Sequence, residues 1–231
     1  LLAAAGMHPD AIEGYLTQTY HHSTIAGQRI THTAATTATM AAAVLHATWN
    51  LFLKTAPPAD RELTAWGMFA SAGVMVLPIV VLLGGPGWVA APWLALSALI
   101  HVGYLLALVS AYHHGDFSLA YPLARGGGAM VATLGGVLLL GDHLNLAAWA
   151  SIVVVGVALG SLVDRGASGR TLRDALVTAL AIGAYTVVDA HGSRVSVDGA
   201  AYGFAVSAAS ACAITIAFLA QGRGPAFAAA W

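Results

Sequence analysis

Charged side chains are scarce in this sequence. They make up 8% of the chain, while 58% of its residues are hydrophobic; soluble domains contain about 25% charged residues. The scarcity of charge argues strongly against a water-soluble fold. Segments of about ten residues with the apolar and polar alternation of a membrane β-barrel are also absent. The near-uninterrupted apolar runs instead predict an all-α membrane protein, a polytopic bundle whose helices satisfy their own backbone hydrogen bonds in lipid.

Other absences narrow the function. The basic residues are few and scattered and the formal net charge is −1, which gives no support to nucleic-acid binding. The single cysteine, Cys212, can form no intrachain disulfide. The adjacent histidines at 21–22 and 113–114 lack the spacing of metal ligands, and no nucleophile elbow, Walker loop or dinucleotide fingerprint occurs. We therefore predict no catalytic residue, metal or cofactor, and expect that the protein is not an enzyme.

About seven apolar segments predict membrane spans, at 34–53, 64–83, 91–112, 121–140, 146–163, 175–190 and 200–220. The fourth and fifth are rich in glycine and are joined by a short polar turn, Gly141 to His143. Small residues spaced four apart let helices approach closely. This spacing predicts helix-packing surfaces at two sets of positions: Gly128, Ala132 and Gly136 in the fourth span, and Gly156 and Gly160 in the fifth.

Polar residues on one face of the first span are candidates for a solute pathway. His46, Asn50 and Lys54 follow at four-residue steps, so they fall within an arc of roughly 80° on a helix. Polar groups inside a bilayer usually face a cavity or a partner. The alternative is that His46 and Asn50 are hydrogen-bonded packing residues and that Lys54 extends to the membrane edge. Tyr104, in the third span, is a further pathway candidate.

Two charged residues lie in later spans. Arg125 follows Tyr121 by one turn in the fourth span, and an arginine inside a membrane needs a partner. Tyr121 and Arg125 are therefore pathway candidates: Arg125 either binds an anionic substrate group or pairs with a carboxylate. The alternative is that Arg125 lies at the membrane interface and holds two helices together. Asp189, near the end of the sixth span, is a candidate for proton coupling or for pairing with Arg125. An ordinary hydrated helix end is the other interpretation of Asp189.

The chain contains a weak internal repeat. Sliding it by 136 residues places Trp49 against Tyr185 and Asn50 against Thr186. If the sixth span is the counterpart of the first, the first unit has five spans. Because five is an odd number, the second unit begins on the other side of the membrane and is inserted in the opposite sense. Inverted repeats of this kind are typical of secondary transporters. On the same offset, about three further spans would follow position 231.

Three segments together resemble a known family. HATWNLFLK in the first span, YPLARG at the head of the fourth, and GGVLLLGDHLNLAAWASIVVVGVALG over the fourth and fifth resemble the EamA domain of the drug/metabolite transporter superfamily. The turn acid is Asp142, where that family often has Glu. The resemblance sets a first repeat at 40–164 and a truncated start of a second repeat at 173–231, with a hydrophilic linker at 165–172. Residues 1–39 precede Met40, a plausible start, and are expected to be a disordered or non-native leader.

The resemblance implies a carrier of about ten helices in two inverted five-helix repeats, which moves a small metabolite or drug-like solute by alternating access. Its partners would be the lipid bilayer and a small-molecule substrate, and its location the cytoplasmic membrane. Proton coupling and simple exchange both stay open, as do the substrate and the oligomeric state. Basic residues in the loops after the first and fifth spans indicate that those loops are cytoplasmic, whereas the resemblance places the amino terminus there.

A membrane-embedded enzyme acting on a lipid or polyprenyl group is the alternative function. Such an enzyme needs acids or a nucleophile together at a membrane surface. The available residues are scattered over loops and helix ends: Asp142, His143, Asp164 and Asp189.

Overall fold

The computed structural model describes residues 32–114, 117–163 and 168–225. Within these ranges the regular structure is entirely helical: α2 (His32–Thr55), α3 (Arg61–Leu82), the 3-10 turn η1 (Trp88–Ala90), α4 (Ala91–His114), α5 (Phe117–Leu140), α6 (Leu146–Leu162), α7 (Gly169–Val195) and α8 (Gly199–Ala220). The predicted all-α architecture is confirmed. The expected ten-helix repeat is not seen, because the described residues form seven α-helices.

Five elements are long and apolar enough to cross a membrane: α3, η1 with α4, α5, α7 and α8. Helix α6 is also apolar but is shorter, with 17 residues. Helix α2 has 24 residues but is not among the five; its threonines and the polar residues His46, Asn50 and Lys54 lower its hydropathy. The architecture is that of a multi-pass membrane protein, with fewer clear spans than the sequence pattern indicated.

Two helices begin earlier than expected. Helix α5 begins at Phe117, so Tyr121 lies in its second turn instead of at its head. Helix α7 begins at Gly169, inside the predicted linker, because the Ser168 hydroxyl accepts a hydrogen bond from the first turn and caps the helix. Most of the leader predicted at 1–39 lies outside the described residues.

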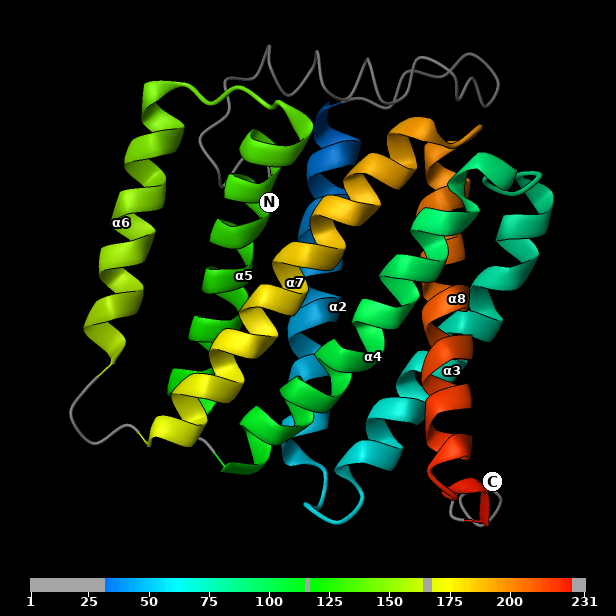
Figure 1. Cartoon of the computed structure of the whole chain (residues 1–231), viewed down its shortest axis with the longest axis horizontal. Coiled ribbons are helices and arrows are strands. Elements are labelled where there is room, and N and C mark those ends of the chain that lie inside the picture. Colours follow the sequence, from blue (N-terminus) through cyan, green and yellow to red (C-terminus); the bar gives the residue numbers. More distant parts are fainter. Residues whose placement is uncertain (1–31, 115–116, 164–167, 226–231) are drawn as a thin grey trace.

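Consecutive helices alternate in direction (Figure 1). Helix α2 runs downward in that view and α7 runs upward, while α3 runs upward and α8 downward. The hairpin of α2 and α3 is therefore inserted in the opposite sense to the hairpin of α7 and α8. Helices α3 and α8 have equal lengths of 22 residues.

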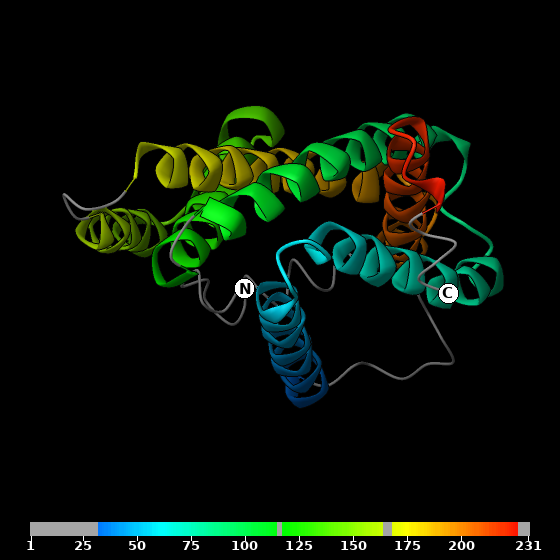
Figure 2. The ribbon, with the colours of Figure 1, turned by 90° about the horizontal axis from the view of Figure 1, so that it is seen from below.

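Helix α4 lies at the centre of the packing. It contacts α7 and α8 closely, and α3 packs along α8. Half of the buried core comes from α4 itself: Tyr104, Leu105, Leu108, Val109, Ala111 and Tyr112. Figure 2 shows α2 and α3 on one side of the layer that the other helices form. Helix α2 has few contacts with the rest of the bundle, and its apolar side chains at Met40, Val44 and Leu45 are exposed.

Helices α5 and α7 make the most extensive contact, and glycines allow it. A Cβ added at Gly128 would lie 2.5 Å from Ile182, and one added at Gly183 would lie 2.5 Å from the Cβ of Val131 and 3.0 Å from the backbone nitrogen of Ala132. The backbones thus approach to a distance that side chains on both helices would prevent.

The other predicted packing glycines differ in what they meet. Gly156 faces the Met130 side chain of α5, with a Cβ-to-carbon distance of 3.2 Å. Gly136 faces the Asp142 carboxylate in the turn after α5 instead of another helix. Nothing among the described residues lies within 4 Å of a Cβ built at Gly160. The second half of the GxxxG pattern therefore contacts no neighbour within the described part of this chain.

Candidate functional site

The polar face of α2 points toward α4. Asn50 is fully buried, and its side-chain amide donates to the His46 carbonyl at 2.8 Å. Its Oδ1 accepts a 2.8 Å hydrogen bond from the Tyr112 hydroxyl of α4. Since both ends of the amide are bonded, Asn50 holds α2 against α4 and is a satisfied packing residue. This geometry agrees with the alternative interpretation of the sequence, in which Asn50 is a hydrogen-bonded packing residue.

Lys54 lies at one end of this interface with a different role. Its ammonium group donates to the Tyr112 carbonyl at 3.1 Å. Buried Arg61, the first residue of α3, donates to the same carbonyl at 3.0 Å. Arg61 also donates to the carbonyls of Lys54 and Ala56. These bonds satisfy carbonyls at the ends of α2 and α4 that have no partner in their own helices, and they tie three helices together.

Arg125 lies in the interior of α5, as its ninth residue, and is half-buried. Its guanidinium group lies within electrostatic range of His46 of α2, of Tyr104 and Tyr112 of α4, and of Tyr185 of α7. We call these five residues the Arg125 cluster. It joins four helices that are far apart in the sequence.

Within the described residues, Arg125 forms no ion pair with a carboxylate. One nitrogen of the cluster also lacks a partner: His46 Nε2 is buried without a hydrogen bond among the described residues. A buried polar atom of this kind costs about 1–3 kcal/mol when it is left unsatisfied. The cluster therefore contains hydrogen-bonding capacity and positive charge that the described part of the protein does not satisfy.

The aromatic rings of the Arg125 cluster pack against further rings from α2 and α4, which in turn contact a ring of α3. The Tyr185 ring stacks on His101 with ring centres 4.1 Å apart and meets Tyr104 edge-on at 5.7 Å. On the other side, Trp49 stacks on His46 at 5.8 Å and contacts Phe69 of α3. We call the whole set the ring cluster: His46, Trp49, Phe69, His101, Tyr104 and Tyr185.

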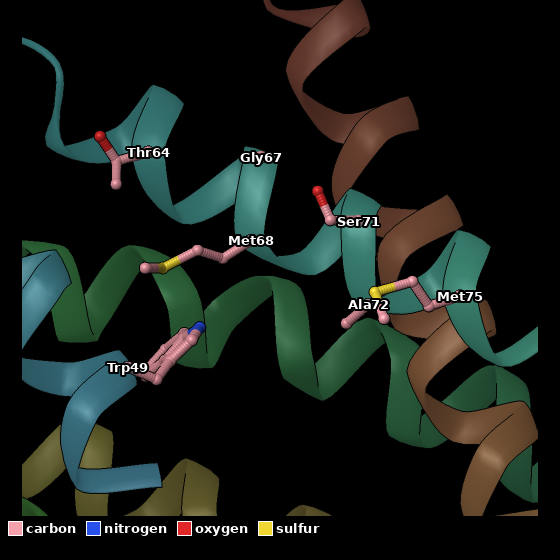
Figure 3. Close-up of a pocket in the computed structure, with 7 residues that line it drawn as sticks. All are labelled: Trp49, Thr64, Gly67, Met68, Ser71, Ala72 and Met75. Carbon is pink, nitrogen blue, oxygen red and sulfur yellow. The ribbon is translucent and has the colours of Figure 1, made fainter. Parts of the chain in front are cut away.

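An open groove begins at the ring cluster and follows α3. Its volume is about 540 Å³, and its lining is mainly apolar: Trp49, Thr64, Gly67, Met68, Ser71, Ala72 and Met75. Figure 3 shows Trp49 pointing from α2 toward Met68 of α3. Arg125 and Asn50 do not line this groove. Trp49 is the link, because its ring forms one end of the groove and stacks on His46.

Asp189 does not pair with Arg125. Its carboxylate accepts a hydrogen bond from the Tyr202 hydroxyl of α8 at 3.2 Å and interacts with Ser97 of α4. It is half-buried near the carboxyl end of α7, where His191 packs on Trp93 with ring centres 4.2 Å apart. Asp189 therefore belongs to a contact among α4, α7 and α8, separate from Arg125.

The structure brings together four of the six pathway candidates. His46, Tyr104 and Arg125 belong to the Arg125 cluster, and Tyr121, in the second turn of α5, lies near Tyr104. Asn50 lies beside them as a packing residue.

The site prediction omitted two residues of the Arg125 cluster, Tyr112 and Tyr185. Tyr185 is the one that the sequence could have revealed. The signal for it was present, because the internal repeat aligns Tyr185 with Trp49, and both rings lie in the ring cluster.

Within the described residues, no group of three or more His, Cys, Asp or Glu side chains is close enough to hold a metal ion. The site is thus an arginine among hydroxyl, imidazole and aromatic groups between membrane helices. Comparisons of the chain with protein-family models, with curated proteins and with solved structures give no match.

Proposed function

We propose that the chain is part of a secondary transporter of the EamA type, which moves a small metabolite or drug-like solute across the cytoplasmic membrane by alternating access. The observation that carries this proposal is the relation between two hairpins. Helices α2 and α3 run opposite to α7 and α8 (Figure 1), and the members of each pair begin 137 and 138 residues apart along the chain. Inverted repeats with a site between them are typical of such carriers.

The position of the Arg125 cluster supports the same proposal. Its residues come from α2, α4 and α5 of the first unit and from α7 of the second. A site at the boundary between two units changes its exposure when one unit rotates against the other, as alternating access requires. The proposal leaves proton coupling and exchange as alternatives.

The packing of α2 fits a second unit with further helices. Helix α7 lies between α4 and α5, whereas α2, its counterpart in the repeat, has few neighbours. If the two units are related by a two-fold axis, copies of α4 and α5 would cover the exposed side of α2.

Transport can be tested before the substrate is known. The full-length protein would be reconstituted into proteoliposomes and offered a mixture of amino acids, organic acids, nucleosides and aromatic drugs. Mass spectrometry of the vesicle contents should then show one solute class that empty liposomes exclude. Arg125→Ala should abolish its entry at an unchanged amount of protein, whereas Arg170→Ala, at an exposed position near the start of α7, should not. If no solute enters above the empty control, the transporter proposal is withdrawn.

No specific observation favours the alternative of a lipid-modifying enzyme. Asp142 pairs with Arg194 at 2.9 Å, and Asp189 bonds to Tyr202. Each acid thus has its own partner, and Asp164 lies outside the described residues.

A further inference from the structure

The charge of Arg125 has no described counter-charge. Six acidic residues lie in the described ranges, and five of them are engaged elsewhere: Glu62 with Arg223, Asp142 with Arg194, Asp174 with Arg173, Asp189 with Tyr202, and Asp198 with the first turn of α8. The sixth, Asp60, precedes α3 at the end of the bundle. A guanidinium group carries a permanent positive charge, and inside a membrane span such a charge requires a partner.

The groups around Arg125 are suited to an anion. The imidazole of His46 can donate from Nε2, which is buried and has no partner among the described residues. The hydroxyls of Tyr104 and Tyr185 are also hydrogen-bond donors. A carboxylate between Arg125 and His46 would provide both the missing counter-charge and the missing acceptor.

The rings and the groove indicate what else the ligand contains. Trp49 stacks directly on His46 and forms one end of the apolar groove between α2 and α3 (Figure 3). A ligand whose carboxylate reaches His46 would place its remaining atoms against Trp49. Those atoms must be apolar or aromatic to match the groove lining of Met68, Ala72 and Met75.

We propose that the Arg125 cluster binds the carboxylate of a small aromatic monoanion, with the aromatic body packed against Trp49 at the mouth of the α2–α3 groove. This inference names the substrate class of the transporter proposed above and rests on that proposal for its biological meaning. An aromatic cluster also suits cations through their attraction to ring faces. The fixed charge of Arg125 decides against a cation, because it repels one from the same rings.

Ligand binding to the purified full-length protein tests this proposal without a transport assay. The melting temperature would be measured at pH 7 against increasing concentrations of benzoate, benzyl alcohol and benzylamine, which share a ring and differ in charge. Benzoate should raise the melting temperature in a saturable way, and the other two should not. Indole-3-acetate and phenylacetate, which are also aromatic monoanions, would be measured in the same way. The proposal is overturned if none of the three anions raises the melting temperature, or if benzylamine raises it as much as benzoate does.

Variants assign the binding to the cluster. Arg125→Gln should weaken benzoate binding at least tenfold, and His46→Phe, which keeps a ring but removes Nε2, should weaken it several-fold. Arg170→Gln, at an exposed position, should bind benzoate like the unchanged protein. If Arg125→Gln does not fold, Arg125→Lys keeps the charge and should retain weakened binding that still excludes benzylamine. Unchanged affinity in both Arg125→Gln and His46→Phe would contradict the assignment.

Flux of labelled benzoate into proteoliposomes separates this inference from the transporter proposal. Binding that depends on Arg125 but comes without flux refutes transport of this ligand class and leaves the binding site in place. Flux of benzylamine or benzyl alcohol that exceeds flux into empty liposomes and that Arg125→Gln does not change refutes the anion site and leaves a transporter.

Discussion

Gly183 is the position where a single added methyl group should separate two helices. It lies on α7 where that helix meets α5, and a Cβ built there would be 2.5 Å from the Val131 Cβ and 3.0 Å from the Ala132 backbone nitrogen. A change of side-chain rotamer at Val131 cannot relieve a contact with its Cβ, since that atom does not move with χ1. The helices themselves must move to accommodate Gly183→Ala.

The size of the effect follows from this distance. A normal carbon–carbon contact is about 3.5 Å, so the helices would have to separate locally by about 1 Å, the difference from the 2.5 Å found for the two Cβ atoms. Overpacking of this kind typically costs about 1–3 kcal/mol. Alanine returns about 0.8–1 kcal/mol through its higher helix propensity. The net destabilisation should therefore reach at most about 2 kcal/mol, which lowers the melting temperature by up to roughly 8 °C for a protein of this length.

Melting of the detergent-solubilised protein measures this prediction, with Gly160→Ala as the matched control. Gly160 is also helical, but nothing among the described residues lies within 4 Å of its added Cβ, so its alanine variant should melt at the same temperature or slightly higher. Gly183→Ala combined with Val131→Gly should be more stable than the sum of the two single changes, because the second removes the clashing Cβ. Equal melting temperatures for Gly183→Ala and Gly160→Ala would refute the close-packing argument.

Three further changes test other contacts by the same melting assay. Tyr112→Phe leaves the buried Asn50 carbonyl without its described donor and should cost about 1–3 kcal/mol; an unchanged melting temperature would show that the bond contributes little. Arg61→Lys keeps the charge but cannot reproduce a guanidinium group that donates to three carbonyls, so it should destabilise the protein. Arg61→Ala should destabilise it more, and a smaller loss of stability in Arg61→Ala than in Arg61→Lys would contradict this account. Asp198→Ala removes the N-cap of α8 and should cost about 0.5–2 kcal/mol, whereas Asp198→Asn, which can still accept, should lose less; equal losses would argue against a capping role.

The positions of the helices were predictable because apolar run length sets a span and local residues end it. Helix α8 was expected at 200–220 and is found at Gly199–Ala220, between the Asp198 cap and Gly222, whose φ of 75° favours glycine. The start of α7 was missed because its first two turns carry Arg170 and Arg173, and such a composition resembles a loop. A helix that extends beyond the lipid can carry such residues in water.

The contacts of the site were less predictable. The four-residue spacing placed His46 and Asn50 on one helix face, but nothing local specifies that Tyr112, 62 residues later, is the partner of Asn50. Glycine spacing has the same limit: Gly156 and Gly160 belong to one GxxxG pattern, yet only Gly156 meets another helix in the described residues. A periodic pattern identifies a face, whereas the partner of that face depends on the tertiary arrangement.

Arg125 differs from the other described cations in where it lies and what it touches. Lys54, Arg61 and Arg194 lie at or near helix ends. Arg125 lies more than two turns inside α5, where a charged residue costs about 2.5–3.5 kcal/mol at the centre of an inserted helix. The helices around it are held by contacts that do not involve it: the hydrogen bonds of Asn50 and Arg61, and the glycine contacts between α5 and α7. Arg125 is thus costly to insert, and its neighbours are hydroxyl, imidazole and aromatic groups instead of a carboxylate. These are the properties expected of a ligand-binding residue.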